Sequence, residues 1–471
     1  MSAVPRQATI LGVLFAGVLM AALDIAIVGP ALPAVQAEFG VGERPLSWVF
    51  SIYVLFNLIG APLLAACSDR YGRRRLYMLS VATFAAGSAL VAAAPSFGML
   101  LAGRAVQAFG AGGIFPVASA VVADAVPHER RGRALGLIGA VFGVAFLLGP
   151  LLGGLLLRFG WPWLFLINLP IAAAVIAASV VVLPDDAARR ERPGGFDAGG
   201  AFTLSVLLAA AAIGINAVDA SSFPRSLGAP AVWPCMLIAA AAVPLLIAAE
   251  RRAAHPIVPP EFFANRRLRA VGAIGLATGA VEAGMVFVPA LAVGAFGVDP
   301  ASASLMLLPL VLTLIAGAPA AGWFLDRIGP RPVIQAGLVA TAAGLALLGR
   351  GPLGLVEFYA AGMLVGLGLS ALLGAPLRYV VLAEVGDARR GAGQGVLTLS
   401  LGIGQLLGSA AIGALAASAG GGAGYAHALW PLALVIVAVL PVTFRLESGR
   451  AAARRPEPRR GAARGEAEEG S

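Results

Sequence analysis

The chain has 471 residues, of which 59% are hydrophobic and 12% charged, and its mean hydropathy is +0.90. This composition excludes an ordinary water-soluble domain and is typical of a protein with many membrane spans. The formal net charge of +9 comes from arginine, because the sequence has no lysine, and this excludes a P-loop and a Schiff-base lysine. The arginines occupy short loops between apolar runs, which indicates membrane topology signals and not nucleic-acid binding.

Fourteen apolar segments are each long enough to cross a bilayer, which takes about 20 residues in a helix. The first follows Arg6 as the core of a signal peptide would. This apolar run extends from Ala8 past Pro30, which is too long for the core of a cleavable signal peptide, and it contains Asp24. We therefore expect it to be the first span. The spans are predicted to begin near Ala8, Ser47, Leu76, Gly98, Arg133, Trp161, Gly199, Ala231, Ala270, Ala301, Val333, Leu355, Ala392 and Ala426.

Arginine is concentrated in every second loop between these spans, for example in residues 70–75, 130–133 and 389–390. Under the positive-inside rule these loops are cytoplasmic, and an even number of spans then places both termini in the cytoplasm. The basic and then acidic segment 447–471 is too polar to pack, so we expect a disordered cytoplasmic tail.

Two patterns occur twice along the chain, at almost the same separation. The glycine-rich stretch 131–154 is matched at 390–413, and the Asp-Arg turn at 69–73 is matched at 326–331. Small residues let membrane helices approach closely, and internal repeats are typical of transporters that rock about a central site. The sequence therefore predicts a duplicated membrane unit.

We therefore expect an all-α polytopic membrane protein with 14 transmembrane helices, in two six-helix pseudo-repeat bundles plus an inserted two-helix hairpin. The two spans that begin near Gly199 and Ala231 have no counterpart in the repeat and form this hairpin. The predicted domains are residues 1–183 for the N-terminal bundle, 184–269 for the linkers and hairpin, 270–446 for the C-terminal bundle, and 447–471 for the tail.

Three ionisable residues inside predicted spans need a physical reason, because each costs roughly 2.5–3.5 kcal/mol to insert into hydrocarbon. Asp24 lies roughly 24 Å into the first span from the cytoplasm and Arg104 roughly 9 Å into the fourth from outside, at a rise of about 1.5 Å per residue. In a core of about 30 Å these depths nearly coincide. An ion pair or a hydrogen-bonded relay is therefore possible, either to exchange protons or as a static pair that fixes two spans.

Glu282 lies near the middle of the ninth span. It is a candidate to bind a cationic compound, to carry a proton, or to do each in turn. The alternative is a neutral glutamic acid that is hydrogen-bonded to a neighbouring helix. If proton and cation exclude each other at one carboxylate, that competition alone couples export to proton entry.

Other polar residues in apolar spans are weaker candidates for binding a substrate, because interhelical hydrogen bonds also explain them. Together with Glu282, the candidate substrate-binding residues are Tyr53, Asn57, Gln107, Asn168, Gln394 and Gln405.

Five motifs in chain order resemble the major facilitator superfamily, and specifically its fourteen-span drug:proton antiporter branch. They are LDIAIVGPALP in the first span, ACSDRYGRRR after the second, RAVQAFGAGG in the fourth, GVAFLLGPLLGG in the fifth and WPWLFLINLP opening the sixth. The sequence departs from the family pattern at Ala26, Gly29, Ala65 and Pro162. The departures in the first span remove polar groups close to Asp24, and this affects the expected substrate range more than the fold.

The resemblance implies roles for two further groups of residues. Asp69 and Arg73 would latch the inward side, with Gly72 permitting the tight turn. The fifth-span glycines and proline would serve close packing, a bending point that seals the membrane against leak, or both, and the resemblance to the antiporter motif favours antiport over uptake. The gating-loop candidates are Asp69, Arg70, Gly72, Arg73, Asp326 and Arg327, and the antiporter-motif residues are Gly143, Gly149, Pro150, Gly153 and Gly154.

The predicted function is that of a proton-coupled antiporter in a bacterial inner membrane, exporting hydrophobic, cationic or amphipathic drugs or antibiotics by alternating access. A dedicated exporter of one natural product or lipid-like molecule is the alternative, and a transport-dead receptor or scaffold is a hypothesis of another class. An enzyme is not expected, because no nucleophile or metal accompanies the carboxylates. The scattered cysteines and histidines predict neither a metal site nor a cofactor. The expected partners are protons, a small hydrophobic substrate and the bilayer, with the chain as a monomer.

Overall fold

The computed structural model describes residues 3–446 except 126–140, 142–143, 146, 185–196, 220–221, 227, 254–256, 258–263, 352, 386–389 and 420. Within this part the chain is all helical and contains no strand. The elements are α1 (Ala3–Phe39), α2 (Glu43–Tyr71), α3 (Arg73–Ala92), α4 (Phe97–Ala125), η1 (Leu157–Phe159), α6 (Trp163–Leu166), α7 (Asn168–Val182), α8 (Ala198–Ala217), α9 (Phe223–Ser226), α10 (Trp233–Arg252), α12 (Arg266–Val286), α13 (Val288–Phe296), α14 (Pro300–Leu305), α15 (Leu308–Ile328), α16 (Pro330–Leu348), α17 (Leu355–Leu373), α18 (Ala375–Glu384), α19 (Arg390–Ala419), α20 (Gly421–Val439) and η4 (Leu440–Arg445).

Among the described residues, 12 helices are long and apolar enough to cross a membrane, or up to 13 if the bent pair α12 and α13 is one span. The predicted fifth span falls largely on residues outside the described part, which contains only the shorter apolar helix Leu147–Phe159. The total of fourteen spans therefore stays a prediction.

The ninth predicted span is broken where α12 meets α13, and the two helices are bent by 42°. The break lies at Phe287, and Pro289 follows as the second residue of α13. A proline at this place cannot donate a backbone hydrogen bond to the preceding turn, and this bends the helix. Glu282 lies in the last part of α12, before the break.

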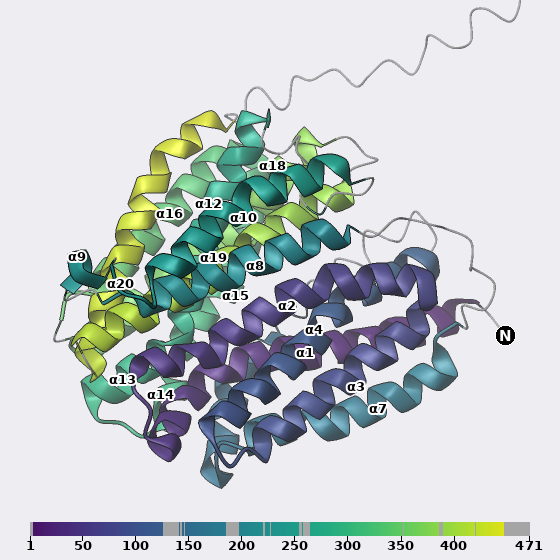
Figure 1. Cartoon of the computed structure of the whole chain (residues 1–471), viewed down its shortest axis with the longest axis horizontal. Coiled ribbons are helices and arrows are strands. Elements are labelled where there is room, and N and C mark those ends of the chain that lie inside the picture. Colours follow the sequence, from purple (N-terminus) through teal and green to yellow (C-terminus); the bar gives the residue numbers. More distant parts are fainter. Residues whose placement is uncertain are drawn as a thin grey trace, which may run out of the picture.

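The helices form two groups with a hairpin beside them (Figure 1). In the N-terminal group (α1 to α7), α4 packs on α2 and α3, and α7 packs on α1 and α3. In the C-terminal group (α12 to α20), α17 packs on α15 and α16, and α19 packs on α12 and α20. The hairpin of α8 and α10 lies against α2 and α19, one helix of each group.

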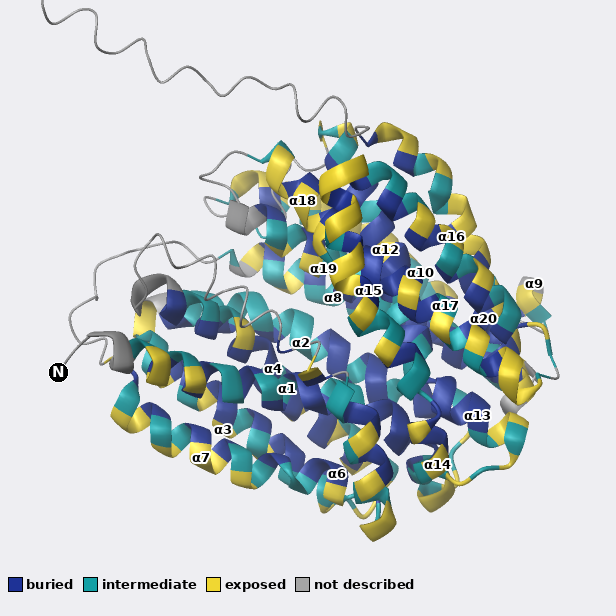
Figure 2. Ribbon diagram, turned by 180° about the vertical axis from the view of Figure 1, so that it is seen from behind, coloured by how far each residue is buried: buried dark blue, intermediate teal, exposed yellow. Residues whose placement is uncertain are grey.

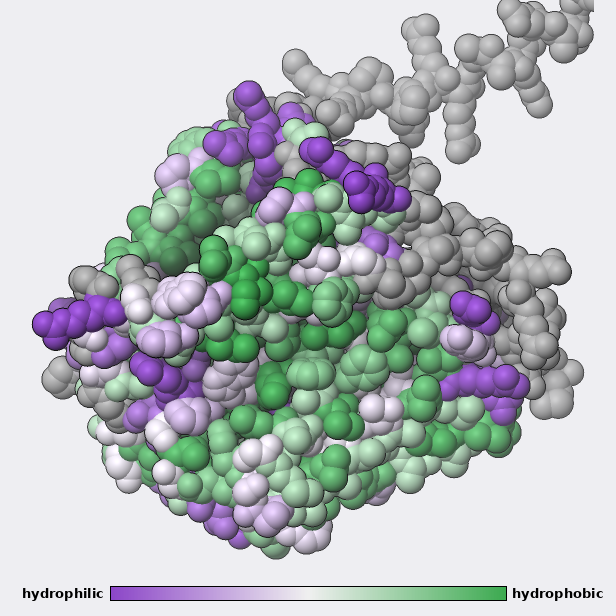
Figure 3. Space-filling view, in the orientation of Figure 1, coloured by the Kyte–Doolittle hydropathy of each residue, from purple (hydrophilic) through white to green (hydrophobic). Residues whose placement is uncertain are grey.

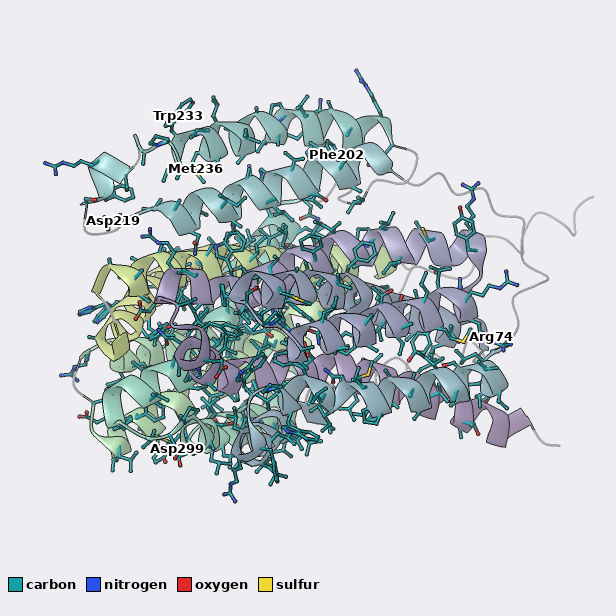
Figure 4. All side chains as sticks on the ribbon, turned by 60° about the horizontal axis from the view of Figure 1, so that its bottom comes forward. Arg74, Phe202, Asp219, Trp233, Met236 and Asp299 are labelled. Atoms are coloured by element: carbon teal, nitrogen blue, oxygen red, sulfur yellow. The ribbon has the colours of Figure 1, made fainter. Side chains whose placement is uncertain are left out.

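The bundle has two ends that carry different residues. At one end, the turn from α2 to α3 carries Arg70, Arg73, Arg74 and Arg75, and this end is called the arginine end below. At the other end lie α14 and the loop that joins α8 to α10, and this is called the α14 end. Figure 4 shows Arg74 at the first and Asp219 and Asp299 at the second. In Figure 1 the two groups come together at the α14 end and spread apart toward the arginine end.

The outer surface between the two ends is apolar. Large hydrophobic side chains are exposed there on several helices, among them Leu79, Leu245, Val339 and Leu434. Hydrophobic residues cover the middle of the face seen in Figure 3, whereas buried residues lie toward the inside of the bundle in Figure 2. This is the reverse of a water-soluble surface and fits contact with lipid.

Two glycines at matching places in the repeated stretch make matching contacts. A Cβ built on Gly149 would lie 2.5 Å from the Cβ of Ala26 on α1, and one built on Gly408 would lie 2.9 Å from the Cβ of Ala280 on α12. Each glycine therefore lets its helix approach the first long helix of its own group closely. This correspondence supports the predicted pseudo-repeat, which stays a prediction.

Candidate functional site

A fully buried polar cluster joins four helices of the N-terminal group. Its members are Asp24 on α1, Ser88 on α3, Arg104 and Gln107 on α4, and Asn168 at the start of α7. None of them is more than 1% exposed. Five polar side chains in the interior of an apolar bundle are costly unless they satisfy one another, so their mutual bonds decide what the cluster can do.

Asp24 is the acceptor at the centre of this cluster. A terminal nitrogen of Arg104 (Nη1) lies 2.6 Å from Oδ2 of Asp24, and Gln107 Nε2 donates to Oδ1 over 2.7 Å. Asn168 Nδ2 donates to the same Oδ1 over 3.2 Å. Gln107 also accepts from Arg104 over 2.6 Å, and both amides donate to the Ser88 hydroxyl. The carboxylate is thus paired and hydrogen-bonded, which is the condition for a charge to remain buried.

Arg104 has partners besides the carboxylate. Its Nε donates to the backbone carbonyl of Val49 over 3.2 Å, and its guanidinium lies 4.2 Å from the ring centre of Tyr53 and 5.6 Å from that of Phe165. Aromatic faces attract a cation at such distances. In the described part of the chain, Arg104 Nη2 and the Tyr53 hydroxyl have no hydrogen-bond partner. Arg104 is therefore held by several groups that do not depend on the charge of Asp24.

Glycines on α3 and α4 bring the members of the cluster together. A Cβ built on Gly87 would clash with the backbone of Gln107, and one built on Gly103 would lie 2.8 Å from the backbone nitrogen of Val91. The two backbones are close enough at these points for the short side chain of Ser88 to reach Gln107. The glycine-rich composition of the fourth span therefore has a direct consequence for the site.

A cavity lies between the two groups of helices. Its empty space is about 730 Å³, including its open side. Among the described residues that line it, Glu282 is the one ionisable residue and Phe50 the one aromatic residue. The lining residues are Ile25, Ala26, Gly29, Pro30, Phe50, Pro150, Glu282, Met285, Val286, Leu307, Leu310, Val311, Leu314, Leu369 and Leu373.

Glu282 lies deep in the bundle but keeps part of its surface accessible to this cavity. The side chain of Gln405 on α19 interacts with its carboxyl group. Asp24 is on the other side of the wall, because its neighbours Ile25 and Ala26 face the cavity while Asp24 itself is fully buried. The structure therefore places one carboxylate against the cavity and seals the other behind it.

Two of the predicted substrate-binding residues lie apart from both groups of polar side chains. Asn57 is half-buried on α2 and is absent from the cavity lining. Gln394, near the start of α19, donates to the backbone carbonyl of Arg378 over 3.2 Å. By contrast, Gln107 and Asn168 belong to the Asp24 cluster, and the ring of Tyr53 lies against its Arg104. Gln405 lies beside Glu282.

Sequence reasoning missed Ser88, Phe165 and Phe50, which contact the cluster or line the cavity. A serine in a small-residue helix and a phenylalanine in an apolar span carry no signal of their own. Spacing along the chain gives the depth of Asp24 and Arg104. It does not give the neighbours that complete their surroundings.

The predicted gating loop forms the turn between α2 and α3. Gly72 has a φ of +100°, a backbone conformation that favours glycine, and its N–H bonds the Ser68 carbonyl. Arg73 donates to the carbonyl of Ala120 near the end of α4, and Arg74 donates to that of Val180 at the end of α7. The Val180 carbonyl is among the last four of α7, which have no partner within the helix, so Arg74 stabilises that helix end. Arg73 ties the turn to α4 of the same group.

Three further gating-loop residues are exposed, namely Arg70, Asp326 and Arg327. Arg70 lies 5.5 Å from the ring centre of Tyr71. In the matching turn, Arg327 lies 3.6 Å from the ring centre of Trp323, and Asp326 is exposed. The side chain of Asp69 lies outside the described part, so the latch predicted for it stays a prediction.

The described part of the antiporter motif joins the two groups at the α14 end. The Ser304 hydroxyl on α14 donates to the Pro150 carbonyl over 2.8 Å, and a Cβ on Gly153 would lie 2.7 Å from that hydroxyl and 2.8 Å from Pro30. A Cβ on Gly154 would lie 3.0 Å from the side chain of Leu305. Gly143 lies outside the described residues. The motif therefore packs where the two groups meet.

Comparison with known proteins agrees with this architecture. The family model described as Major Facilitator Superfamily matches residues 14–281 and 270–470. An uncharacterized MFS-type transporter of Bacillus subtilis, YfiU, is 35% identical over 83% of this chain and 76% of its own length. The multidrug resistance protein Stp of Mycobacterium tuberculosis is 31% identical over 85% of this chain and 74% of its own length. The chain belongs to the major facilitator superfamily.

Further similarities are more distant or shorter. Multidrug resistance protein 3 of Bacillus subtilis is 30% identical over 72% of this chain, which spans 65% of that relative. The crystal structure of a bacterial homologue of the human lysosomal transporter Spinster, inward-facing and occupied, superposes with a TM-score of 0.68 at 16% identity, covering 96% of this chain and 99% of the other. At this identity the likeness shows the transporter fold alone. No family of enzymes is indicated.

Proposed function

We propose that this member of the superfamily is a proton-coupled antiporter that exports hydrophobic, cationic or amphipathic compounds by alternating access. One observation carries the proposal. An apolar cavity between two groups of helices contains a single accessible carboxylate, Glu282, and a second carboxylate, Asp24, is sealed directly behind the cavity wall. The relatives named as multidrug resistance proteins support drugs as the cargo.

The chemistry of the cavity supports a lipophilic cation as the substrate. Aliphatic side chains dominate the lining and bind apolar surface without fixed geometry, which suits compounds of varied shape. A carboxylate in such surroundings is poorly solvated and gains most from a positive charge nearby. Glu282 then holds either a proton or a cationic group, and the exclusion of one by the other gives the exchange.

Asp24 is proposed as the second proton site. When its carboxylate takes up a proton, the O–H becomes a donor, and one of the donors now aimed at it, Arg104, Gln107 or Asn168, loses its acceptor. Arg104 retains Gln107, Val49 and the Tyr53 ring, so the cation stays held. The bonds that change join α1, α4 and α7, and protonation therefore alters how these helices are held together.

The topology is also part of the proposal. Fourteen spans, domain boundaries at residues 183, 269 and 446, and a cytoplasmic arginine end follow from the repeat and the positive-inside rule. A bacterial inner membrane and a monomeric state complete it. With the arginine end inside, inward proton flow supplies roughly 2.3 kcal/mol per charge per 100 mV, besides the pH gradient.

The test uses proteoliposomes with tetraphenylphosphonium as a lipophilic cation and an uncharged lipophilic dye as the comparison. Glu282→Gln is expected to abolish binding of the cation and to spare the dye, and Asp24→Asn and Arg104→Ala to abolish substrate-driven proton release. The matched control is Glu357→Gln, which alters an exposed carboxylate at the start of α17. Undiminished proton release in all three site variants refutes the assignment, and resistance to one compound alone on expression identifies a dedicated exporter.

A further inference from the structure

The hairpin of α8 and α10 has no part in the transport chemistry above, yet it is docked with specific polar contacts. Figure 4 shows it as a separate layer beside the two groups, with Asp219 and Trp233 at the α14 end and Phe202 toward the other. α10 contributes a largely exposed apolar face, whereas α8 lies between it and the groups and contacts α2 and α19. Among the described residues, the side-chain hydrogen bonds that join α8 to α2 and α19 are those of Asn216 in its last turn.

Asn216 in that turn bonds one helix of each group. Its Nδ2 donates to the hydroxyl of Ser47 on α2 over 2.9 Å and to the carbonyl of Ala410 on α19 over 3.3 Å. Its Oδ1 accepts from the indole nitrogen of Trp48 on α2 over 3.0 Å. Asn216 is 5% exposed, so these bonds form away from water and lipid. One amide thus uses both its donor and its acceptor atoms across the seam between the groups.

The surroundings of Asn216 are shaped to admit it. A Cβ built on Gly413 of α19 would lie 2.9 Å from the Asn216 amide nitrogen and would clash with the Ser47 side chain. One turn deeper, Ser51 and Ser409 form a direct hydrogen bond of 2.7 Å between α2 and α19. The glycine and the two serines therefore let α2, α8 and α19 meet at one point of the α14 end.

We propose that Asn216 makes the hairpin a strap that stabilises the state in which the two groups are closed together at the α14 end. α2 belongs to one group and α19 to the other, so opening this end separates Ser47 and Trp48 from Ala410. Asn216 then keeps its bonds to one helix and loses those to the other. A contact present in one state and broken in the other shifts the equilibrium between them, whatever the substrate.

The test measures conformation directly, in the full-length chain in lipid nanodiscs. Spin labels at Ala93 and Val356, after Cys67 and Cys235 are replaced by alanine, report the distance between the groups at the α14 end. Ala93 follows α3, and Val356, which is 81% exposed, opens α17. Asn216→Ala is expected to raise the ratio of long to short distances about three- to twentyfold, the range that one interhelical hydrogen bond supplies.

Two further variants keep the outcome decisive. The double variant Ser47→Ala/Trp48→Phe removes both partners on α2 and leaves α8 intact, so it must shift the ratio in the same direction even if Asn216→Ala does not fold. Ser205→Ala is the control, because that hydroxyl bonds only the backbone of its own helix. An unchanged ratio in the double variant, or an equal shift in Ser205→Ala, overturns the strap. Because no transport is measured, failure of the proton-coupled mechanism would leave this result standing.

Discussion

The substitution Gly149→Ala tests whether the antiporter motif depends on close packing. The new Cβ would lie 2.5 Å from the Cβ of Ala26 and 3.1 Å from that residue's carbonyl carbon and oxygen. Carbon atoms pack at about 3.5–4.0 Å, so the two helices must separate by about 1 Å at this point. Because two of the three nearest atoms belong to the backbone of α1, no side-chain rotation relieves the contact.

The expected magnitude follows from two opposing effects. Overpacking costs about 1–3 kcal/mol, and alanine regains about 1 kcal/mol of helix propensity over glycine. Gly149→Ala should therefore lower the free energy of unfolding by about 0–2 kcal/mol. Gly12→Ala on α1 is the matched control, because a Cβ there meets no atom within 4 Å. It should gain the propensity without the clash and raise the free energy of unfolding by about 1 kcal/mol.

The assay is a dodecyl sulfate titration of the purified protein in mixed micelles, followed by circular dichroism. A second readout is substrate binding, because Ala26 lines the cavity and moves with the clash. If Gly149→Ala proves as stable as Gly12→Ala, the packing described for this motif is not a constraint, and a role in bending or sealing must be argued from something else.

Two further predictions concern buried and exposed charge. Arg104→Gln should destabilise the protein by about 3–5 kcal/mol, because it leaves Asp24 buried without its counter-ion. The double variant Asp24→Asn/Arg104→Gln should recover much of that loss. A double variant that is as unstable as Arg104→Gln in the same titration would contradict an ion pair. At the start of α14, hydrogen bonds from the Ser302 side chain and backbone, with a weaker one from Ala301, hold the pKa of Asp299 below its usual value. Because this pKa is lowered, the ionised Asp299 cap stabilises α14 at every pH above the ordinary aspartate pKa. The stabilisation is lost as the pH falls through the pKa that Asp299 has in the folded protein. Amide exchange in residues 300–305 should therefore accelerate on acidification, and Asp299→Asn should abolish that pH dependence.

The parts of the architecture that follow from hydropathy are those the sequence predicts well. The apolar segments and the tight turn at Gly72 each depend on a local pattern, namely the length of an apolar run or a glycine within a charged loop. The bend between α12 and α13 lies beside Pro289, but Pro62 and Pro116 lie inside unbroken helices, so a proline alone does not predict the break. Local patterns predict helices, whereas the angles between them depend on packing.

The site divides in the same way. The depths of Asp24 and Arg104 are read from residue counts, and the structure brings the two to 2.6 Å. Ser88, Phe165 and the cavity-lining Phe50 come from other helices, and nothing in their own neighbourhoods marks them. Asn57 and Gln394 looked equivalent to Gln107 in composition, but they lie on helix faces that do not reach the cluster. A polar residue in an apolar span is a candidate site residue, but the packing of the helices decides which cluster it joins.

The two carboxylates differ in one physical respect that bears on the order of events. A proton or cation that enters the cavity meets Glu282 directly, because that side chain faces the open space. It cannot meet Asp24 without crossing the wall formed by Ile25 and Ala26 or waiting until the helices move, since Asp24 is fully buried with Arg104, Gln107 and Asn168 around it. In the state closed at the α14 end, Glu282 is therefore the carboxylate that a proton or cation in the cavity can reach. Access to Asp24 requires a change of conformation. If the strap at Asn216 sets how often that change occurs, then the hairpin controls the rate at which the second carboxylate exchanges its proton, without touching either carboxylate.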